Sequence, residues 1–303
     1  LYISAEIEVI EGSVIERVYR KIEDLFSKLY TKDNRLKIFQ TIPSFKNINN
    51  LRIREQLASW EGIPHTELVR MDDEECREFI KNHFDRKYLE GYDGIYPGAF
   101  KSDIWRLCVL YKYGGLYLDA KLKLVRKDKL MYFLNKYDVC LVKDYSKIAK
   151  YSIYTVFMYF RYPRNEIILE ILDTILSNIK TKNRSHCLYL TGPVLHSEII
   201  LKHMNYKNRN NIRYKELDYY YFFNKNSIRK NKGVYYMNNI KLVDAYYANK
   251  FEDLEHLSNQ EHYIKLWNKN IIFMYDVTIM CILQDSESYL KYLDRTMSRI
   301  EEY

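Results

Sequence analysis

The feature that most constrains the fold is a helix pattern that stops at a glycine pair and continues as a short apolar run. Residues 98–113, GAFKSDIWRLCVLYKY, form the predicted helix, and Gly114 and Gly115 end it. The next residues, LYL, have a strand pattern, and Asp119 follows them directly. The sequence therefore predicts a turn that leads into a buried strand, with a carboxylate where the strand ends.

Short β-prone runs alternate with helix patterns before this helix. LKIFQTI (residues 36–42) is the first predicted strand and TELVRM (residues 66–71) the second, with helices near 48–60 and over 72–84. Such an alternation predicts an α/β fold with a parallel sheet. Ligands of such sheets bind at the carboxyl ends of the strands.

The pattern after Asp119 predicts further strands and helices. The strands are DVCLVKD, SIYTVFMYF and two short runs around IRYKEL and GVYYM. The helices are PRNEIILEILDTILSNI, with Pro163 at its start, and TGPVLHSEIILKHM, with Thr191 as its cap. The Tyr-rich run LDYYYFF, residues 217–223, is interpreted as a strand in the core or at an edge, with a sugar-stacking platform as the alternative.

An amphipathic helix is also predicted over residues 13–31, where Ser13 and Glu16 form a capping box. The favoured interpretation is that it packs on the main domain, and a contact between two copies in a homodimer is the alternative. No repeat and no Gly/Ser linker divides the rest of the chain. We therefore expect a helical N-terminal extension, residues 1–34, and one α/β domain, residues 35–303.

The net charge of +8 favours anionic partners such as nucleotide diphosphates, nucleic acid or acidic membranes. The charge is spread along the chain, and its densest run, RKNKG at residues 229–233, is interpreted as a solvated loop. The sequence has no RNA-binding signature and no alternation of aromatic and basic residues, so no nucleic-acid partner is expected. A nucleic-acid-binding protein is a third hypothesis that rests on charge alone.

The five cysteines form no CxxC pair, which argues against a zinc site and favours a reducing compartment. No apolar run approaches the ~20 residues that a membrane helix needs, and no signal peptide is visible. These features favour the cytoplasm and predict no transmembrane segment. The abundance of Lys, Asn, Ile and Tyr suggests an AT-rich genome, such as that of a large virus or a parasite. The sequence begins with Leu1 rather than Met, which leaves open whether a segment precedes it.

Two charged residues share one face of the predicted helix 98–113. Asp103 and Arg106 are close enough along the helix to form an ion pair, and Ala99 leaves room beside them. Such a pair alone is usually a surface salt bridge that contributes little stability. The direct connection of this helix to the strand that ends at Asp119 favours a functional site.

The stretch AFKSDIWRLCVLYKYGGLYLDAK, residues 99–121, resembles the sugar-binding region of DXD-type glycosyltransferases. It is similar to glycosyltransferase family 32, which includes initiating mannosyltransferases of yeast and capsular sugar transferases, and the glucosylating clostridial toxins carry a related segment. KIFQT, TGPVLHSEII and HYIKLWNKNIIF resemble other parts of the family in the same order. The resemblance therefore runs from Leu36 to Phe273.

The resemblance implies a GT-A fold, in which a Rossmann-like nucleotide-binding sheet is flanked by helices. It implies transfer of a sugar, with retention at the anomeric carbon, from a nucleotide-sugar, with a UDP-sugar favoured. The implied acceptor is a glycan, a glycoprotein or a lipid. In many retaining enzymes of this fold the leaving phosphate takes the acceptor proton, so no base is expected. The sequence nominates no carboxylate nucleophile for a double displacement.

By the same resemblance, the donor contacts come from two parts of the chain. Asp103 and Arg106 would hydrogen-bond to hydroxyls of the donor sugar, with Ser102 nearby. Gln40 and Thr41, at the end of KIFQT, would contribute to donor binding from the first strand.

The resemblance also implies a metal and a closing aromatic residue. Asp119 would be the first acid of the DXD motif, a catalytic residue that contacts the ribose or the sugar and, through water, a Mn²⁺ or Mg²⁺ ion. Trp267 would lie on a mobile loop that closes over the diphosphate. His262 would contact a phosphate or the metal, with an ordinary surface histidine as the equal alternative.

Two positions depart from the family pattern. Lys121 stands where relatives have the second acid, and an ammonium group cannot ligate a metal ion. Lys121 would either act in catalysis by neutralising the leaving diphosphate, which makes the metal dispensable or loosely held, or mark a site that binds without catalysis. The intact Asp103, Arg106 and Asp119 favour an active enzyme. Ile42 stands where the toxins have a Trp that stacks on the base, so the sequence leaves the base open.

Overall fold

The structure, a computed structural model, describes most of the chain between Arg35 and Tyr275. The described residues are 35–45, 48, 50–135, 137–144, 152–203, 220–229, 232–237, 240–246 and 260–275. The predicted helix at 13–31 and the predicted strand at 212–217 lie outside them, and the expected domain boundaries stay predictions. Of the helices within these ranges, none is long and apolar enough to cross a membrane.

The described strands form one nine-stranded mixed sheet, in the order β2-β1-β3-β6-β5-β7-β8-β9-β4. β1 (Leu36–Thr41) pairs in parallel with β2 (Thr66–Met71) on one side and with β3 (Gly115–Leu118) on the other. These three strands therefore end at the same edge of the sheet. Asp119 follows β3 directly, so the sequence-based prediction of a carboxylate at the carboxyl end of a strand is confirmed.

The remaining strands extend the sheet beyond β3. β6 (Ser152–Phe160) runs antiparallel to β3 and to β5 (Val139–Asp144), and β7 (Tyr220–Arg229) runs parallel to β5. Residues 220–223, the part of the Tyr-rich run that the structure describes, therefore belong to a strand in the interior of the sheet, between β5 and β8. Antiparallel pairing then adds β8 (Lys232–Met237), β9 (Ile240–Tyr246) and β4 (Leu122–Leu124).

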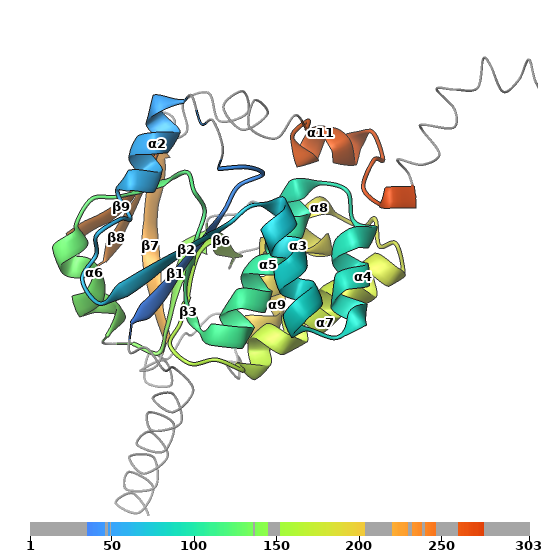
Figure 1. The fold of residues 1–303 in the computed structure, drawn as a ribbon, viewed down its shortest axis with the longest axis horizontal. Coiled ribbons are helices and arrows are strands. Elements are labelled where there is room, and N and C mark those ends of the chain that lie inside the picture. Colours follow the sequence, from blue (N-terminus) through green and yellow to red (C-terminus); the bar gives the residue numbers. More distant parts are fainter. Residues whose placement is uncertain are drawn as a thin grey trace, which may run out of the picture.

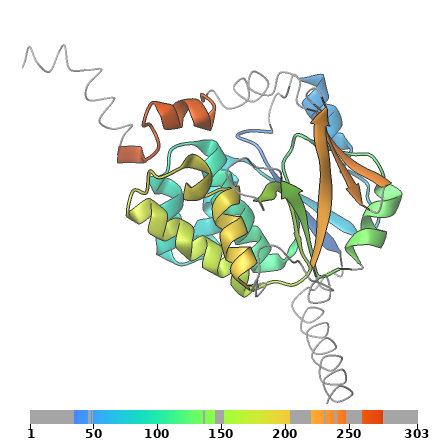
Figure 2. The ribbon, with the colours of Figure 1, turned by 180° about the vertical axis from the view of Figure 1, so that it is seen from behind.

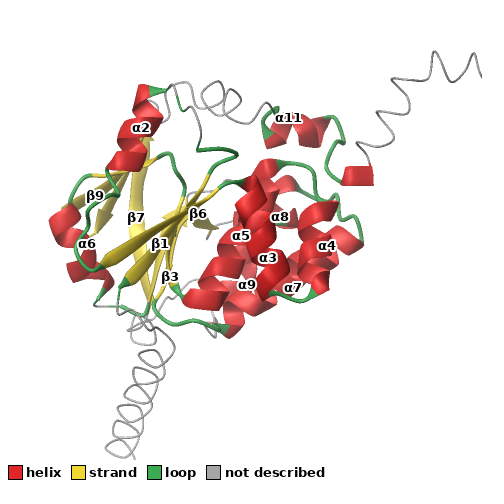
Figure 3. Cartoon of the chain, viewed as in Figure 1, coloured by secondary structure: helices red, strands yellow, loops and turns green. Residues whose placement is uncertain are grey.

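Most of the described helices gather beside one part of the sheet, as Figures 1 and 3 show, and the view from behind shows the same group (Figure 2). On the other side, α2 (Leu51–Ala58) contacts β4, and α6 (Lys127–Leu134) contacts β9. The short helix α11 (Tyr263–Asn268) contacts α5. A sheet flanked by helices confirms the predicted α/β class. The predicted parallel sheet is wrong as a description of the whole sheet, because among the described strands only the pairings β1–β2, β1–β3 and β5–β7 are parallel. The large group consists of α3 (Asp73–His83), α4 (Arg86–Gly94), α5 (Gly98–Tyr113), α7 (Glu166–Lys180), α8 (Cys187–Leu190) and α9 (Pro193–His203).

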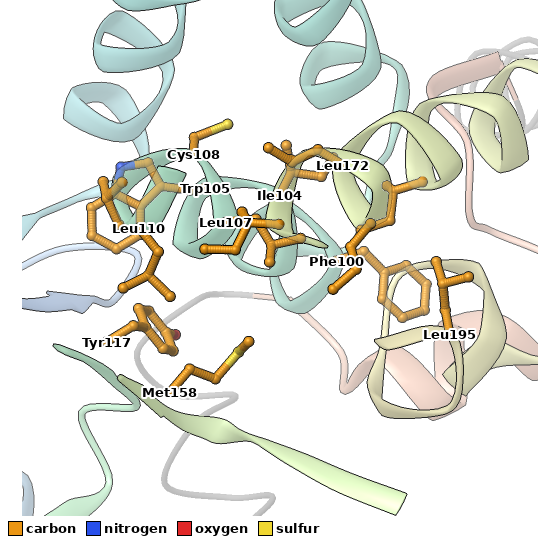
Figure 4. Packing of buried hydrophobic residues seen from close by; sticks show 14 of the residues in the cluster. Phe100, Ile104, Trp105, Leu107, Cys108, Leu110, Tyr117, Met158, Leu172 and Leu195 are labelled. Carbon is orange, nitrogen blue, oxygen red and sulfur yellow. The ribbon is translucent and has the colours of Figure 1, made fainter. Parts of the chain in front are cut away.

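α5 is the central helix of the larger hydrophobic core, and every side chain from Asp103 to Leu110 is buried. Trp105 packs edge-on against Phe39 of β1 and against Tyr117 of β3. Figure 4 shows Tyr117 on the sheet side of this cluster, facing α5. α5 is therefore fixed against the two parallel strands, and its charged residues are buried with it.

The opposite face of the same strands has a second core. Successive strand side chains point to opposite faces, so Ile38 and Leu116 lie on the face away from α5. There they join a cluster with Trp60 and with Leu130 and Leu134 of α6. The successive apolar residues Ile38 and Phe39 of β1, and the apolar residues of β3, are thus explained, because both faces of these strands are covered.

Two helix starts differ from the sequence-based prediction. α7 begins at Glu166 rather than at Pro163, because the side chain of Asn165 caps it by accepting hydrogen bonds from the next backbone amides. α9 begins at Pro193, where a proline without an N–H is well tolerated. Thr191 does not cap α9, because its hydroxyl donates instead to Asp103, 2.7 Å away.

The glycine pair makes the turn from α5 into β3 possible. Gly114 has φ +65° and donates its amide to the Leu110 carbonyl, which closes the helix. Gly115 has φ +97°, and a Cβ atom there would lie 2.5 Å from the backbone oxygen of Lys37 in β1. The two glycines therefore supply both an unusual backbone conformation and a close approach between neighbouring strands.

We expect Gly115→Ala to lower the free energy of unfolding by about 2–5 kcal/mol, since a strained backbone adds to a clash with β1. Gly62→Ala is the matched control, because Gly62 also has positive φ but no atom lies within 4 Å of an added Cβ. The control should cost about 1 kcal/mol, from the backbone alone. Urea denaturation measures both values, and equal losses would show that the strand contact contributes nothing.

Candidate functional site

The end of β3 and one face of α5 bring charged side chains together. The guanidinium of Arg106 forms an ion pair with Asp103 at 3.0 Å and lies 3.6 Å from the nearer carboxylate oxygen of Asp119. Asp103 and Arg106 are 8% and 4% exposed, so the pair is buried rather than on the surface. The structure therefore brings together the three residues that the sequence singled out from α5 and β3.

Arg106 is held in place from several directions. It donates to the Thr155 carbonyl of β6 at 2.6 Å and to the Ser102 hydroxyl at 3.4 Å. Its guanidinium carbon also lies 4.5 Å from the centre of the Tyr117 ring, at cation–π distance. Ser102 is thus next to Arg106, as predicted from the sequence, and the guanidinium has little freedom to move.

Asp119 has a partner at each carboxylate oxygen. The Tyr117 hydroxyl donates to Oδ1 at 2.9 Å, and the Lys121 ammonium lies 2.7 Å from Oδ2. The backbone explains the second contact, since Leu122 donates its amide to the Asp119 carbonyl and so closes a tight turn that contains Lys121. Asp103, Arg106, Asp119 and Lys121 therefore form a four-charge cluster with two positive and two negative side chains.

The turn at Thr191 also belongs to this site, through hydrogen bonds that the sequence did not predict. The Thr191 hydroxyl donates to Asp103, and the Thr191 carbonyl accepts a hydrogen bond from Nε2 of the buried His196 on α9. A lone histidine within an apolar helix pattern gives no signal of this role. The pairing of the Thr-Gly-Pro segment with the Ser-Asp segment follows only from the packing of α9 beside α5.

The two carboxylic acids of the four-charge cluster have pKa values that shift in opposite directions. Burial raises the pKa of Asp103 to about 6, against the lowering effects of Arg106 and of the Thr191 hydrogen bond. Burial would also raise the pKa of Asp119, but Lys121 and then Arg106 hold it below its usual value. Asp119 is therefore the firmer anion of the two near neutral pH.

Gln40 and Thr41 lie at the same edge of the sheet, but their side chains hydrogen-bond to residues of β2 rather than to the four-charge cluster. Gln40 accepts a hydrogen bond from Arg70 at 3.1 Å, and the Thr41 hydroxyl donates to the Met71 carbonyl at 2.7 Å. Both contacts tie β1 to β2. A donor-binding role for Gln40 and Thr41 stays a prediction.

Trp267 lies in α11 rather than on a mobile loop, which corrects the sequence-based expectation. Its ring packs edge-on against Phe100 near the start of α5, with the ring centres 6.3 Å apart. His262 caps α11, because its Nδ1 accepts from the amide of Ile264 at 3.3 Å. Gln260 accepts from the amide of Gly98 and fixes this segment to α5. Roles for Trp267 and His262 in donor or metal binding stay predictions.

The buried charged cluster lies at the carboxyl ends of the parallel strands, which is where α/β proteins bind their ligands. Residues 52–139 match the family model described as glycosyltransferase sugar-binding region containing DXD motif. The four-charge cluster lies entirely within that match. Residues 52–139 are therefore similar to the sugar-binding region of DXD-type glycosyltransferases, the family that the sequence resemblance also indicated.

Two known proteins are similar to parts of this chain. An uncharacterised glycosyltransferase of Acanthamoeba polyphaga mimivirus is 44% identical over 48 residues, which are 16% of this chain and 19% of that protein. The match thus spans about a fifth of the relative's length. The PaToxG glycosyltransferase has a solved structure that is 16% identical, with a TM-score of 0.41, and the match covers 65% of this chain and 83% of that one.

The described residues do not offer a ready site for the divalent metal that DXD-type glycosyltransferases typically use. Among them, no group of three or more His, Cys, Asp or Glu side chains could hold an ion. Asp119 is the acid of the motif, but its two oxygens already face Tyr117 and Lys121. The donor set at this position therefore does not fit Mn²⁺ or Mg²⁺ without a rearrangement.

Thr191→Val should lower the free energy of unfolding by about 1–3 kcal/mol, because it leaves a buried carboxylate oxygen of Asp103 without its donor. Thr174→Val is a matched control on α7, where the hydroxyl donates only within its own helix. Its cost should stay below about 0.5 kcal/mol. Chemical denaturation of both variants checks the difference, and a Thr191→Val variant as stable as the parent would contradict the described contact.

His196 gives a prediction about pH. Burial lowers the pKa of His196 to about 3, and the charge of Arg106 adds to the lowering. The unfolded chain therefore binds this proton below about pH 6.5 while the folded chain does not, so stability falls with falling pH by up to about 1.4 kcal/mol per unit.

His196→Gln keeps a donor for the Thr191 carbonyl and should remove this pH dependence. The raised pKa of Asp103 has the opposite sign, but it is present in parent and variant and cancels in their difference. Urea denaturation between pH 7.5 and 5 measures the difference, with His65→Gln at an exposed histidine as control. Parallel curves for parent and His196→Gln would contradict the buried neutral imidazole.

Proposed function

We propose that the chain is a retaining glycosyltransferase that moves a sugar from a nucleotide-sugar, with a UDP-sugar favoured, to a glycan, a glycoprotein or a lipid. The observation that carries the proposal is Arg106, which lies within ion-pair distance of both Asp103 and Asp119 inside the matched sugar-binding region. Cytoplasmic location is part of the proposal, and the free thiols of the buried Cys76, Cys108 and Cys140 support it.

The chemistry of the cluster suits a hexose. Sugar hydroxyls donate to carboxylates and accept from a guanidinium, so Asp103, Asp119 and Arg106 offer both kinds of partner over a short distance. Arg106 is already fixed by Thr155 and Tyr117, which reduces the freedom that is lost when a sugar binds. The buried surroundings strengthen each of these polar contacts.

The proposed reaction exchanges one bond at the anomeric carbon for another and transfers one proton. The bond from the anomeric carbon to the phosphate oxygen breaks, and its electron pair stays with the diphosphate. The acceptor hydroxyl oxygen bonds to the anomeric carbon on the same face, and its proton passes to the leaving phosphate. Asp119 is not assigned as a nucleophile here, because Tyr117 and Lys121 engage its oxygens.

The position of Ile42 bears on the choice of nucleotide base. Ile42 is buried and packs with Ile53, Leu57 and Ala120 rather than presenting a ring. The partly buried Phe45 also packs against this cluster, so a base held there would meet aliphatic side chains and a phenyl ring instead of an indole. The test of the proposed function therefore compares donors with different bases, first UDP-sugars and then GDP-sugars.

A domain that binds a nucleotide-sugar or glycan without turnover is the second candidate. Lys121 in place of the second acid favours it, since relatives use that acid for the metal. The two candidates differ in one measurable respect, because only an enzyme consumes the donor. Binding of UDP-sugars by calorimetry without any hydrolysis or transfer would support the second candidate.

Incubation with a panel of UDP- and GDP-sugars should reveal hydrolysis or transfer of at least one donor. Asp103→Asn should reduce that turnover by about 10²-fold or more, because it removes the charge that pairs with Arg106 and accepts from the sugar. Asp173→Asn is the control, an exposed acid paired with Lys87, and should leave turnover within about twofold. If no donor is consumed and none binds, the proposed function is wrong.

A further inference from the structure

The position of Lys121 leads to an inference that rests on the proposed function and concerns its metal requirement. We infer that the Lys121 ammonium occupies the place of the divalent ion, so that the protein binds the diphosphate of its donor without a metal. This metal-free binding of the diphosphate is the same for any acceptor, sugar or base.

The first support is the partner set of Asp119. Its Oδ2 lies 2.7 Å from the Lys121 ammonium, and its Oδ1 accepts from the Tyr117 hydroxyl at 2.9 Å and lies 3.6 Å from Arg106. A metal ion at this carboxylate would meet two positive side chains at short range. Both would repel it, and one of them would have to move away.

The second support is the scarcity of other ligands. Within the described part of the chain, no three His, Cys, Asp or Glu side chains lie close enough together to hold an ion. Asp103 does not make up the shortage, because its oxygens are engaged by Arg106 and by the Thr191 hydroxyl. Mg²⁺ and Mn²⁺ prefer several oxygen ligands, and each carboxylate oxygen of this cluster already has a hydrogen-bond donor or a positive side chain beside it.

The third support is how the turn holds Lys121. The hydrogen bond from the Leu122 amide to the Asp119 carbonyl closes a turn between β3 and β4, which sets the ammonium beside the carboxylate. The Lys121 side chain is 22% exposed, so it is partly buried but still accessible to a ligand from solvent. An ammonium is a compact point charge that binds phosphate well. Lys121 can therefore keep Asp119 as one partner and present its remaining donors to a diphosphate.

Lys123 provides a matched control for this residue. It stands two positions further along, in β4, and pairs with Glu55 at 3.0 Å on the surface. The Lys123 side chain is 49% exposed, and this pair belongs to α2 and β4 rather than to the four-charge cluster. Lys121→Met and Lys123→Met thus remove the same group from neighbouring places, with only the first inside the cluster.

The experiment uses the full chain and two readouts, donor turnover and binding of UDP and GDP by calorimetry, each with EDTA and with Mn²⁺. For the parent, turnover and nucleotide affinity should agree within about twofold in EDTA and in Mn²⁺. Lys121→Met should weaken nucleotide binding by at least tenfold and reduce turnover by about 10²-fold or more. Lys123→Met should match the parent. Lys121→Asp restores the second acid of the motif and should bind Mn²⁺ in the presence of UDP, which titration calorimetry detects directly.

The outcomes separate the inference from the function on which it rests. Turnover that stops in EDTA and returns with Mn²⁺ overturns the inference and leaves the glycosyltransferase proposal standing. Metal-independent nucleotide binding that depends on Lys121, without any turnover, supports the inference and overturns the proposed transfer. Absence of any nucleotide binding by the parent overturns both. Saturable Mn²⁺ binding by the parent that Asp119→Asn abolishes also overturns the inference.

Discussion

The rest of the site depends on the ion pairs that the buried guanidinium of Arg106 forms with Asp103 and Asp119. Arg106 is 4% exposed and joins two carboxylates from different elements, while β6 and the Tyr117 ring fix its position. Burying charges is costly unless each one is paired, and a buried ion pair is weak evidence for stability. A cluster of this kind at the carboxyl ends of the parallel strands of a mixed sheet is therefore better explained by ligand binding than by folding.

The backbone conformation at the glycine pair brings the residues of this cluster together. The positive φ angles of Gly114 and Gly115 turn the chain from α5 directly into β3, so that residues of one helix face come to lie beside the end of the next strand. The apolar residues of α5 hold the helix against β1 and β3, and the same packing buries Asp103 and Arg106. The hydrophobic core and the charged site are thus two consequences of one helix–turn–strand unit.

Much of the architecture was predictable because local signals agreed with the tertiary fold. The bounds of α5 and the strands at 66–71, 138–144 and 152–160 followed from helix-ending glycines and β-prone runs. Helix periodicity predicted that Asp103 and Arg106 lie close together, and the family resemblance implied that Asp119 belongs to the same site. Residues 13–31 lie outside the described chain, so the predicted helix there stays a prediction.

The contacts that the sequence did not reveal depend on long-range packing. Thr191 has the pattern of a helix cap, and only the approach of α9 to α5 turns its hydroxyl toward Asp103. The helical setting of Trp267 depends on the docking of α11 against Phe100, across most of the domain sequence. The start of α7 at Glu166 depends on the side chain of Asn165, which competed locally with Pro163 as a helix-start signal.

The most direct test of the central claim is a crystal structure of the protein with an intact nucleotide-sugar bound. The account predicts hydroxyls of the sugar within about 2.6–3.2 Å of Asp103 and Arg106, and Asp119 close to the sugar or the ribose. A donor bound at another place, with the contacts among Asp103, Arg106 and Asp119 unchanged and remote from the sugar, would contradict it.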